Sequence, residues 1–144
     1  MTNKPSAIIR PKTRDKLRSI IKKELKKNGH ECDLNHIDVS LVTDISYLFH
    51  NSPFDGDISK WDVSRAETMD YMFFSSSFKK DVSGWSRSSV KTDEGMFLDS
   101  AIAKKLELKN PSFDQVKSYF LRLKLEDVFP KSLGEESQVS KARL

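Results

Sequence analysis

The stretch Ile37-Asp38-Val39-Ser40 returns 24 residues later as Trp61-Asp62-Val63-Ser64, and a divergent third copy begins at Trp85. The rest of each unit repeats in the same register, as Leu48-Phe49, Met72-Phe73 and Met96-Phe97, and as Phe54, Phe78 and Ile102. A fixed period of this length is typical of repeat proteins, in which each unit buries its apolar side against its neighbours. We therefore expect residues 37–106 to form three stacked 24-residue repeats.

One unit reads Ile/Trp-Asp-Val-Ser-x-x-x-x-Met/Ile-x-x-Met/Leu-Phe, followed by Ser, Phe and Asp-Ile-Ser. This pattern resembles the BspA-like leucine-rich repeats, which occur largely in bacterial surface proteins. The stretch from Arg10 to Asp38 is similar to the N-terminal cap often found before such repeats. The resemblance implies an α/β fold, namely a short leucine-rich-repeat-like solenoid with N- and C-terminal capping helices, and a role in binding proteins. It brings no catalytic residues with it.

The chain also departs from this family. The third copy is degraded, since Arg87 replaces the core Val and Asp93 replaces the core Ile or Met. No apolar export segment follows Met1, and no stretch approaches the roughly 18 apolar residues of a membrane span. The single cysteine, Cys32, excludes an internal disulfide and fits a reducing compartment. We therefore expect a cytoplasmic protein without a membrane partner.

Charge is unevenly distributed along the chain. Residues 1–29 carry a net charge of +8, residues 30–103 a net charge of −7 and residues 104–144 a net charge of +3. The overall value of +4 conceals this separation. The pattern predicts acidic repeats between basic ends.

A helix over residues 13–28 is expected to cap the start of the repeats, with Thr13 as its N-cap. Its apolar residues fall at helical spacing and should face the repeats: Leu17, Ile20, Ile21 and Leu25. Basic residues cover the remaining surface of this helix, and five of them form a candidate binding face: Arg14, Arg18, Lys22, Lys23 and Lys26. A solvated face over a capping helix is the favoured explanation of the same charges, because charge runs are common on exposed helices.

A second helix over residues 112–125 is expected to close the other end, because Ser112 and Gln115 have the spacing of a capping box. Its predicted apolar stripe consists of Phe113, Val116, Tyr119, Phe120 and Leu123. Residues 1–130 then form a single repeat domain, and residues 131–144 a disordered tail.

Within each repeat, the phenylalanines at positions 49, 73 and 97 are predicted to form one buried column. Trp61 and Trp85 should pack between adjacent coils, with each indole N–H hydrogen-bonded. The recurring aspartates should accept backbone N–H groups at tight corners: Asp38, Asp57, Asp62 and Asp81.

Patterns that would indicate an enzyme or a metal site are weak. Repeated aspartates occupy like environments, whereas acid–base catalysis needs carboxyl groups in unlike ones. Asp55-Gly56-Asp57 lacks the glycine and glutamate of a calcium loop, since Lys60 and Ala66 stand at those places. His30, Cys32 and His36 lack a fourth ligand for zinc. We expect no catalytic residues, no metal and no cofactor.

Several side chains next to the inward-facing positions vary freely between copies, which suits an exposed binding surface. Aromatic residues among them are candidate anchors, and Tyr47 belongs with these. The predicted partner-binding residues on the repeats are Arg65, Glu67, Asp70, Tyr71, Phe74, Lys91 and Glu94. Simple solvation of a variable surface accounts for the same variation.

The function expected from these features is that of a non-enzymatic protein–protein interaction module. A cytosolic binder or inhibitor, such as a phage or mobile element encodes against a host defence system, fits this description. A bacterial surface or adhesion repeat protein is one alternative. A nucleic-acid binder that uses the basic N-terminal helix is another, although no aromatic residues lie between its basic ones for base stacking.

Overall fold

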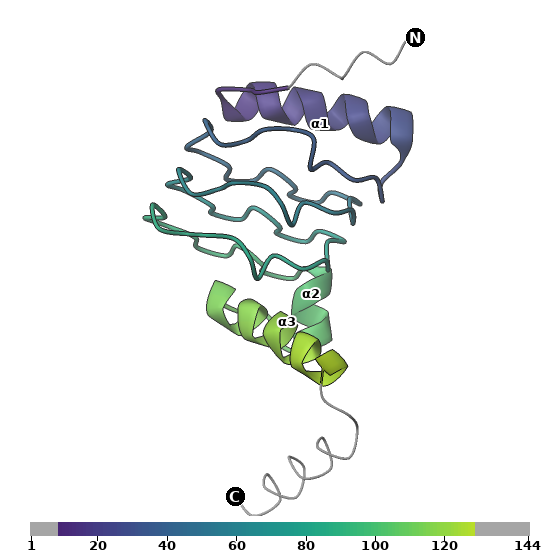
Figure 1. The fold of residues 1–144 in the computed structure, drawn as a ribbon, viewed down its shortest axis with the longest axis vertical. Coiled ribbons are helices and arrows are strands. Elements are labelled where there is room, and N and C mark those ends of the chain that lie inside the picture. Colours follow the sequence, from purple (N-terminus) through teal and green to yellow (C-terminus); the bar gives the residue numbers. More distant parts are fainter. Residues whose placement is uncertain (1–8, 129–144) are drawn as a thin grey trace, which may run out of the picture.

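Helices close both ends of a stack of coils (Figure 1). The computed structural model describes residues 9–128. Helix α1 (Arg14–Asn28) lies across one end, while α2 (Ala101–Leu106) and α3 (Phe113–Val128) lie at the other. Between them the chain winds through a first coil (residues 37–60), a second coil (residues 61–84) and a third coil (residues 85–106), which ends with α2.

The expectation of an α/β leucine-rich-repeat-like solenoid is wrong. Residues 9–128 contain three α-helices but no β-strand and no sheet. Parallel pairing in this part of the chain is confined to isolated bridges: Ile9 with Ile37, Asp44 with Thr68, and Thr68 with Thr92. The coils consist of turns and irregular backbone, so the α/β class does not describe the fold.

Left-handed backbone explains why no strand forms. Two positions of every coil have positive φ: Tyr47, Tyr71 and Gly95 at the first, and Asn51, Ser75 and Asp99 at the second. Extended strands need negative φ at every residue, so a left-handed residue interrupts them. Adjacent coils are still joined by backbone hydrogen bonds, as when Tyr47 N donates to Asp70 O and Phe49 N donates to Met72 O, but the left-handed residues keep these bonds from forming a regular ladder.

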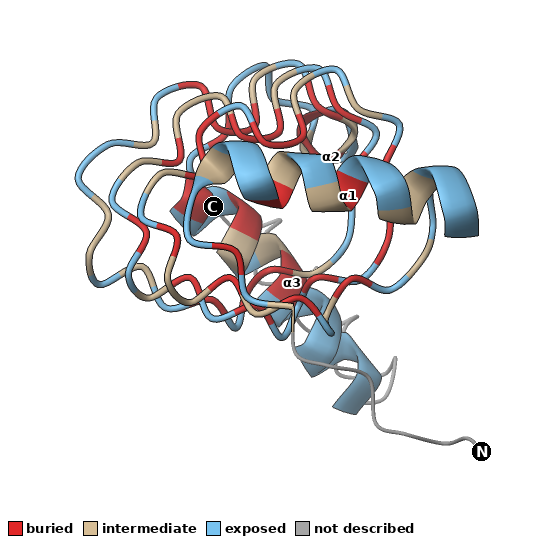
Figure 2. Ribbon diagram, turned by 90° about the horizontal axis from the view of Figure 1, so that it is seen from above, coloured by how far each residue is buried: buried red, intermediate tan, exposed pale blue. Residues whose placement is uncertain are grey.

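Aromatic residues occupy the interior of the stack in register. The predicted column is confirmed, because Phe49, Phe73 and Phe97 are buried with ring centroids 5.6 and 5.4 Å apart. Trp61 and Trp85 are also buried, and their indole N–H groups donate to Leu34 O and Ile58 O, as predicted. Figure 2, which looks along the stack, shows buried residues along the coils and exposed ones on the outer turns.

Helix α1 seals the first coil. The Thr13 side chain accepts a hydrogen bond from Lys16 N, which is the expected N-cap, and the chain leaves the helix at Gly29 with a φ of 90°. Leu17 and Ile21 are buried against the coil, whereas Ile20 and Leu25 are partly buried. The predicted apolar stripe is thus the face that packs on the repeats.

The C-terminal cap is longer than expected and has two helices. The Ser112 and Gln115 pair forms its capping box, with both reciprocal hydrogen bonds present. Phe113, Val116 and Phe120 are buried beneath the third coil. Leu123 was predicted to join them but is 39% exposed, because α3 extends past the stack from residue 121 onward (Figure 2). The tail predicted over residues 131–144 lies outside the described residues.

Candidate functional site

Four aromatic rings gather on the outside of the first two coils. Tyr47 stacks on Tyr71 with centroids 5.3 Å apart, and His50 stacks on Phe74 at the same separation. Edge-to-face contacts join the two stacks, at 5.7 Å between Tyr47 and His50 and 5.8 Å between Tyr71 and Phe74. All four side chains are exposed or partly exposed. We call Tyr47, His50, Tyr71 and Phe74 the aromatic face.

The tyrosines of this face lie on strained backbone. Tyr47 and Tyr71 have φ values of 58° and 54°, and the equivalent residue of the third coil is Gly95 at 59°. A Cβ atom on Gly95 would lie 2.4 Å from Cε1 of Tyr71. The glycine therefore makes room for the Tyr71 ring, and the aromatic stack ends there.

Two carboxylates border the aromatic face. Asp70 Oδ1 accepts hydrogen bonds from Thr92 Oγ1 at 2.7 Å and from Glu94 N at 2.8 Å. Glu94 Oε2 accepts the Tyr71 hydroxyl at 3.1 Å, which raises the pKa of Tyr71. Neither carboxylate forms an ion pair within residues 9–128. We call Asp70 and Glu94 the acidic pair.

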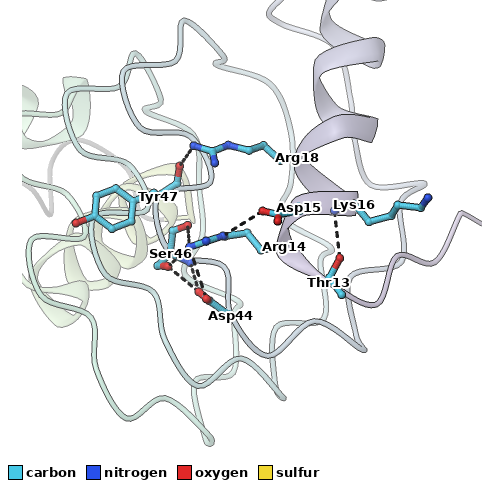
Figure 3. A network of polar contacts seen from close by, with 8 residues as sticks. All are labelled: Thr13, Arg14, Asp15, Lys16, Arg18, Asp44, Ser46 and Tyr47. Atoms are coloured by element: carbon cyan, nitrogen blue, oxygen red, sulfur yellow. Dashed lines mark hydrogen bonds and ion pairs between the residues drawn. The ribbon is translucent and has the colours of Figure 1, made fainter.

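Helix α1 reaches the same side of the first coil through two arginines (Figure 3). Arg14 Nη1 donates to Ser46 Oγ at 2.8 Å and lies 3.5 Å from Asp44 Oδ2. Arg18 Nη2 donates to the carbonyl oxygen of Tyr47 at 3.5 Å. Both had been predicted as part of a partner-binding face on the helix. In the structure their side chains contact the first coil and link α1 to it.

The other predicted residues of the basic helix do face outward. Lys22, Lys23 and Lys26 are exposed and form no ion pair with any residue that the structure describes. Lys12, Lys16 and Lys27 share this condition. These six side chains are the lysine face.

The residues predicted on the repeats fall into two groups and one isolated side chain. Asp70, Tyr71, Phe74 and Glu94 lie together, as described above. Glu67 and Lys91 form an exposed ion pair at 3.1 Å. Arg65 is exposed, and within the described residues no hydrogen bond or ion pair links it to the others.

Sequence reasoning missed His50, the fourth ring of the aromatic face. The 24-residue register contains the signal for it, because His50 precedes Phe74 by one repeat just as Tyr47 precedes Tyr71. A comparison of repeats by aromatic character rather than by identity would have placed it beside the tyrosines.

An acidic hollow of about 450 Å³ lies elsewhere, where Asp55, Asp57 and Asp81 come close to Glu31 and Lys80. Its carboxylates have local partners: Asp55 pairs with Lys79 at 2.8 Å, and Asp57 accepts Ser59 N. Within residues 9–128 no group of three His, Cys, Asp or Glu side chains is arranged to hold a metal.

The recurring aspartates at the corners of the coils do accept backbone N–H groups two residues on, as predicted: Asp38, Asp57, Asp62 and Asp81. Hydrogen bonds from the Ser40 side chain and backbone, together with Arg10, lower the pKa of Asp38 to about 2. Hydrogen bonds from the following serines also lower the pKa of Asp57 and Asp62. These carboxylates hold corners of the coils together.

Comparison with known proteins identifies a family but no characterised relative. In the described part of the chain, no helix is both long and apolar enough to cross a membrane. No curated protein and no solved structure matches the chain. Residues 17–131, which include most of α1, all three coils and α3, match one family. The chain belongs to the family described as Mycoplasma protein of unknown function, DUF285.

Proposed function

We propose that this protein is a non-enzymatic protein-binding module and that the aromatic face, with the acidic pair beside it, contacts the partner. The observation that carries the proposal is the placement of Tyr47 and Tyr71 on left-handed backbone at the surface. Aromatic residues are enriched among the anchors of protein interfaces, where they bury large areas at low entropic cost.

The energetics of these tyrosines favour a role beyond folding. A left-handed conformation costs a non-glycine residue about 1–2 kcal/mol, and this position accepts glycine in the third coil. Each aromatic pair contributes about 0.5–1.5 kcal/mol, and the two tyrosines take part in three such pairs, so their contacts roughly offset the cost of the strain without a clear net gain in stability. Tyr47 is 40% exposed and adds little to the core. Burial of these rings against a partner would contribute the binding free energy that offsets this strain.

Substitution by glycine tests the proposal, because it removes the ring and relieves the backbone at once. Tyr47→Gly and Tyr71→Gly should leave the melting temperature unchanged or raised while they abolish capture of the partner from the native cell. Ser75→Gly is the matched control, since Ser75 is exposed with a φ of 54° but carries no ring. If both tyrosine variants capture the same partner as the unmodified chain, the proposal is wrong.

The setting of this binding role is also part of the proposal. The repeats are related to the BspA-like pattern by their Asp-Val-Ser and Met-Phe sequences, although they lack strands. The protein acts in the cytosol as a binder or inhibitor, which the single cysteine Cys32 supports. Recovery of the protein from the cell envelope after fractionation would favour the alternative role in surface adhesion.

A second candidate function, nucleic-acid binding, has one observation in its favour. The lysine face presents exposed charges on α1 and just before it that form no ion pair with the described residues, and phosphate contacts depend on such charges. Within the described residues of α1, no aromatic side chain is present for base stacking. A steep loss of DNA affinity with added salt, removed by substitution of the lysines, would support this candidate.

A further inference from the structure

We propose that the acidic pair binds arginine side chains of the protein partner, an inference that rests on the proposed function. The second and third coils place Asp70 and Glu94 side by side, since Glu94 N donates to Asp70 Oδ1 at 2.8 Å. Both carboxylates also adjoin the aromatic face, because Tyr71 donates its hydroxyl hydrogen to Glu94 Oε2.

The first coil shows an arginine bound at the equivalent place. Ser46, Asp70 and Glu94 occupy the same position of successive repeats. At Ser46 the guanidinium of Arg14 donates to the hydroxyl oxygen at 2.8 Å, and Asp44 lies 3.5 Å from the same nitrogen (Figure 3). A helix of the protein itself thus supplies the cation for the first coil, whereas the second and third coils lie farther from α1 along the stack (Figure 1).

Two carboxylate oxygens remain available at the acidic pair. Asp70 Oδ2 and Glu94 Oε1 form no hydrogen bond with any described residue, whereas the other oxygen of each carboxylate accepts one or two. A planar guanidinium has five N–H donors in a fixed fork and can address two such oxygens together. An ammonium group is a compact charge without this geometry, so arginine fits better than lysine.

Six of the nine other carboxylates in the coils have a cation from the described part of the chain, whereas Asp57, Asp62 and Asp99 do not. The pairs are Asp38 with Arg10, Asp44 with Arg14, Asp55 with Lys79, Glu67 with Lys91, Asp81 with Lys124 and Asp93 with Arg87. The acidic pair lacks one within residues 9–128, although it lies beside the aromatic face. The net charge of −7 over residues 30–103 attracts a basic partner to this surface.

The test uses hexa-arginine and hexa-lysine peptides as probes with the full-length chain, observed by NMR on ¹⁵N-labelled protein. Hexa-arginine should shift the amide signals of Asp70, Tyr71 and Glu94 first and should bind more tightly than hexa-lysine. Asp70→Asn combined with Glu94→Gln should weaken hexa-arginine binding by about tenfold, the amount expected for loss of charge-assisted hydrogen bonds.

The control removes two exposed negative charges elsewhere, through Glu31→Gln and Glu126→Gln, and should weaken binding by less than about twofold because exposed charges act weakly at a distance. Equal losses in the two double variants, or signal shifts spread over all acidic residues, would overturn the inference. Capture of the protein partner distinguishes failure of the arginine site from failure of the proposed function. If Tyr71→Gly abolishes capture and the Asp70→Asn, Glu94→Gln variant retains it, only the arginine site is wrong.

Discussion

Arg87 and Asp93 form an ion pair of 2.6 Å in the third coil, and the Arg87 guanidinium lies 4.3 Å from the ring centroid of Phe113 in α3. The two residues replace apolar ones of the earlier coils and compensate one another. Their positions also adapt the last coil to its helix, because a guanidinium over an aromatic face is an attractive contact. The divergent third repeat therefore provides the surface on which the C-terminal helix α3 packs.

The first prediction concerns this pair. Asp93→Ala should destabilise the fold by about 1–3 kcal/mol, because it leaves the partly buried Arg87 without its charge partner. The double variant Arg87→Val, Asp93→Ile restores the residue types of the first coil and should be less destabilised than Asp93→Ala alone. Urea denaturation of the single and double variants measures both effects. A double variant that is destabilised as much as Asp93→Ala, or more, would contradict this compensation.

The second prediction concerns the phenylalanine column. Phe73→Ala should lower the free energy of unfolding by about 3–5 kcal/mol, since Phe73 is fully buried between Phe49 and Phe97. Phe74→Ala is the matched control, because the neighbouring ring is partly exposed and should cost clearly less. A melting temperature that Phe73→Ala leaves unchanged would contradict the packing described here.

The third prediction concerns the lysine face. Reversal of Lys22, Lys23 and Lys26 to Glu should change stability by less than about 1 kcal/mol, because these side chains are exposed and unpaired in the described structure. The same variant should retain the protein partner captured through the aromatic face. Circular dichroism and the capture assay check the two outcomes. Loss of the partner without loss of folding would move the binding site to α1.

The fourth prediction concerns acid stability. The folded state lowers the pKa of Asp38 from 3.8 to about 2. The ionised carboxylate therefore stabilises the fold fully at pH values above the pKa of Asp38 in the unfolded chain. This stabilisation should disappear as the pH falls from about 4 to about 2. Asp57 and Asp62 act in the same direction. Thermal melts across this range should show the decline, and Asp38→Asn, which cannot ionise, should make it shallower.

The sequence predicted the interior of the molecule well. The 24-residue period aligned Phe49 with Phe73 and Phe97. Apolar residues at equivalent positions of stacked repeats are buried together in one shared core. Local chemistry was equally direct, since Thr13 and Ser112 cap their helices through their own neighbours. The candidate site was recovered in part, with Asp70, Tyr71, Phe74 and Glu94 brought together and His50 overlooked.

The sequence by itself thus determined the period, the buried columns and the capping helices α1 and α3, because spacing and local hydrogen bonding decide them, whereas α2 was not predicted. Only the tertiary structure decided the backbone class and the partners of the charges. Left-handed φ at Tyr47 and Tyr71 excludes strands, yet tyrosine does not signal that conformation. Arg14 turns inward because Asp44 and Ser46, some 30 positions away in sequence, are folded against α1, a contact that no local pattern encodes.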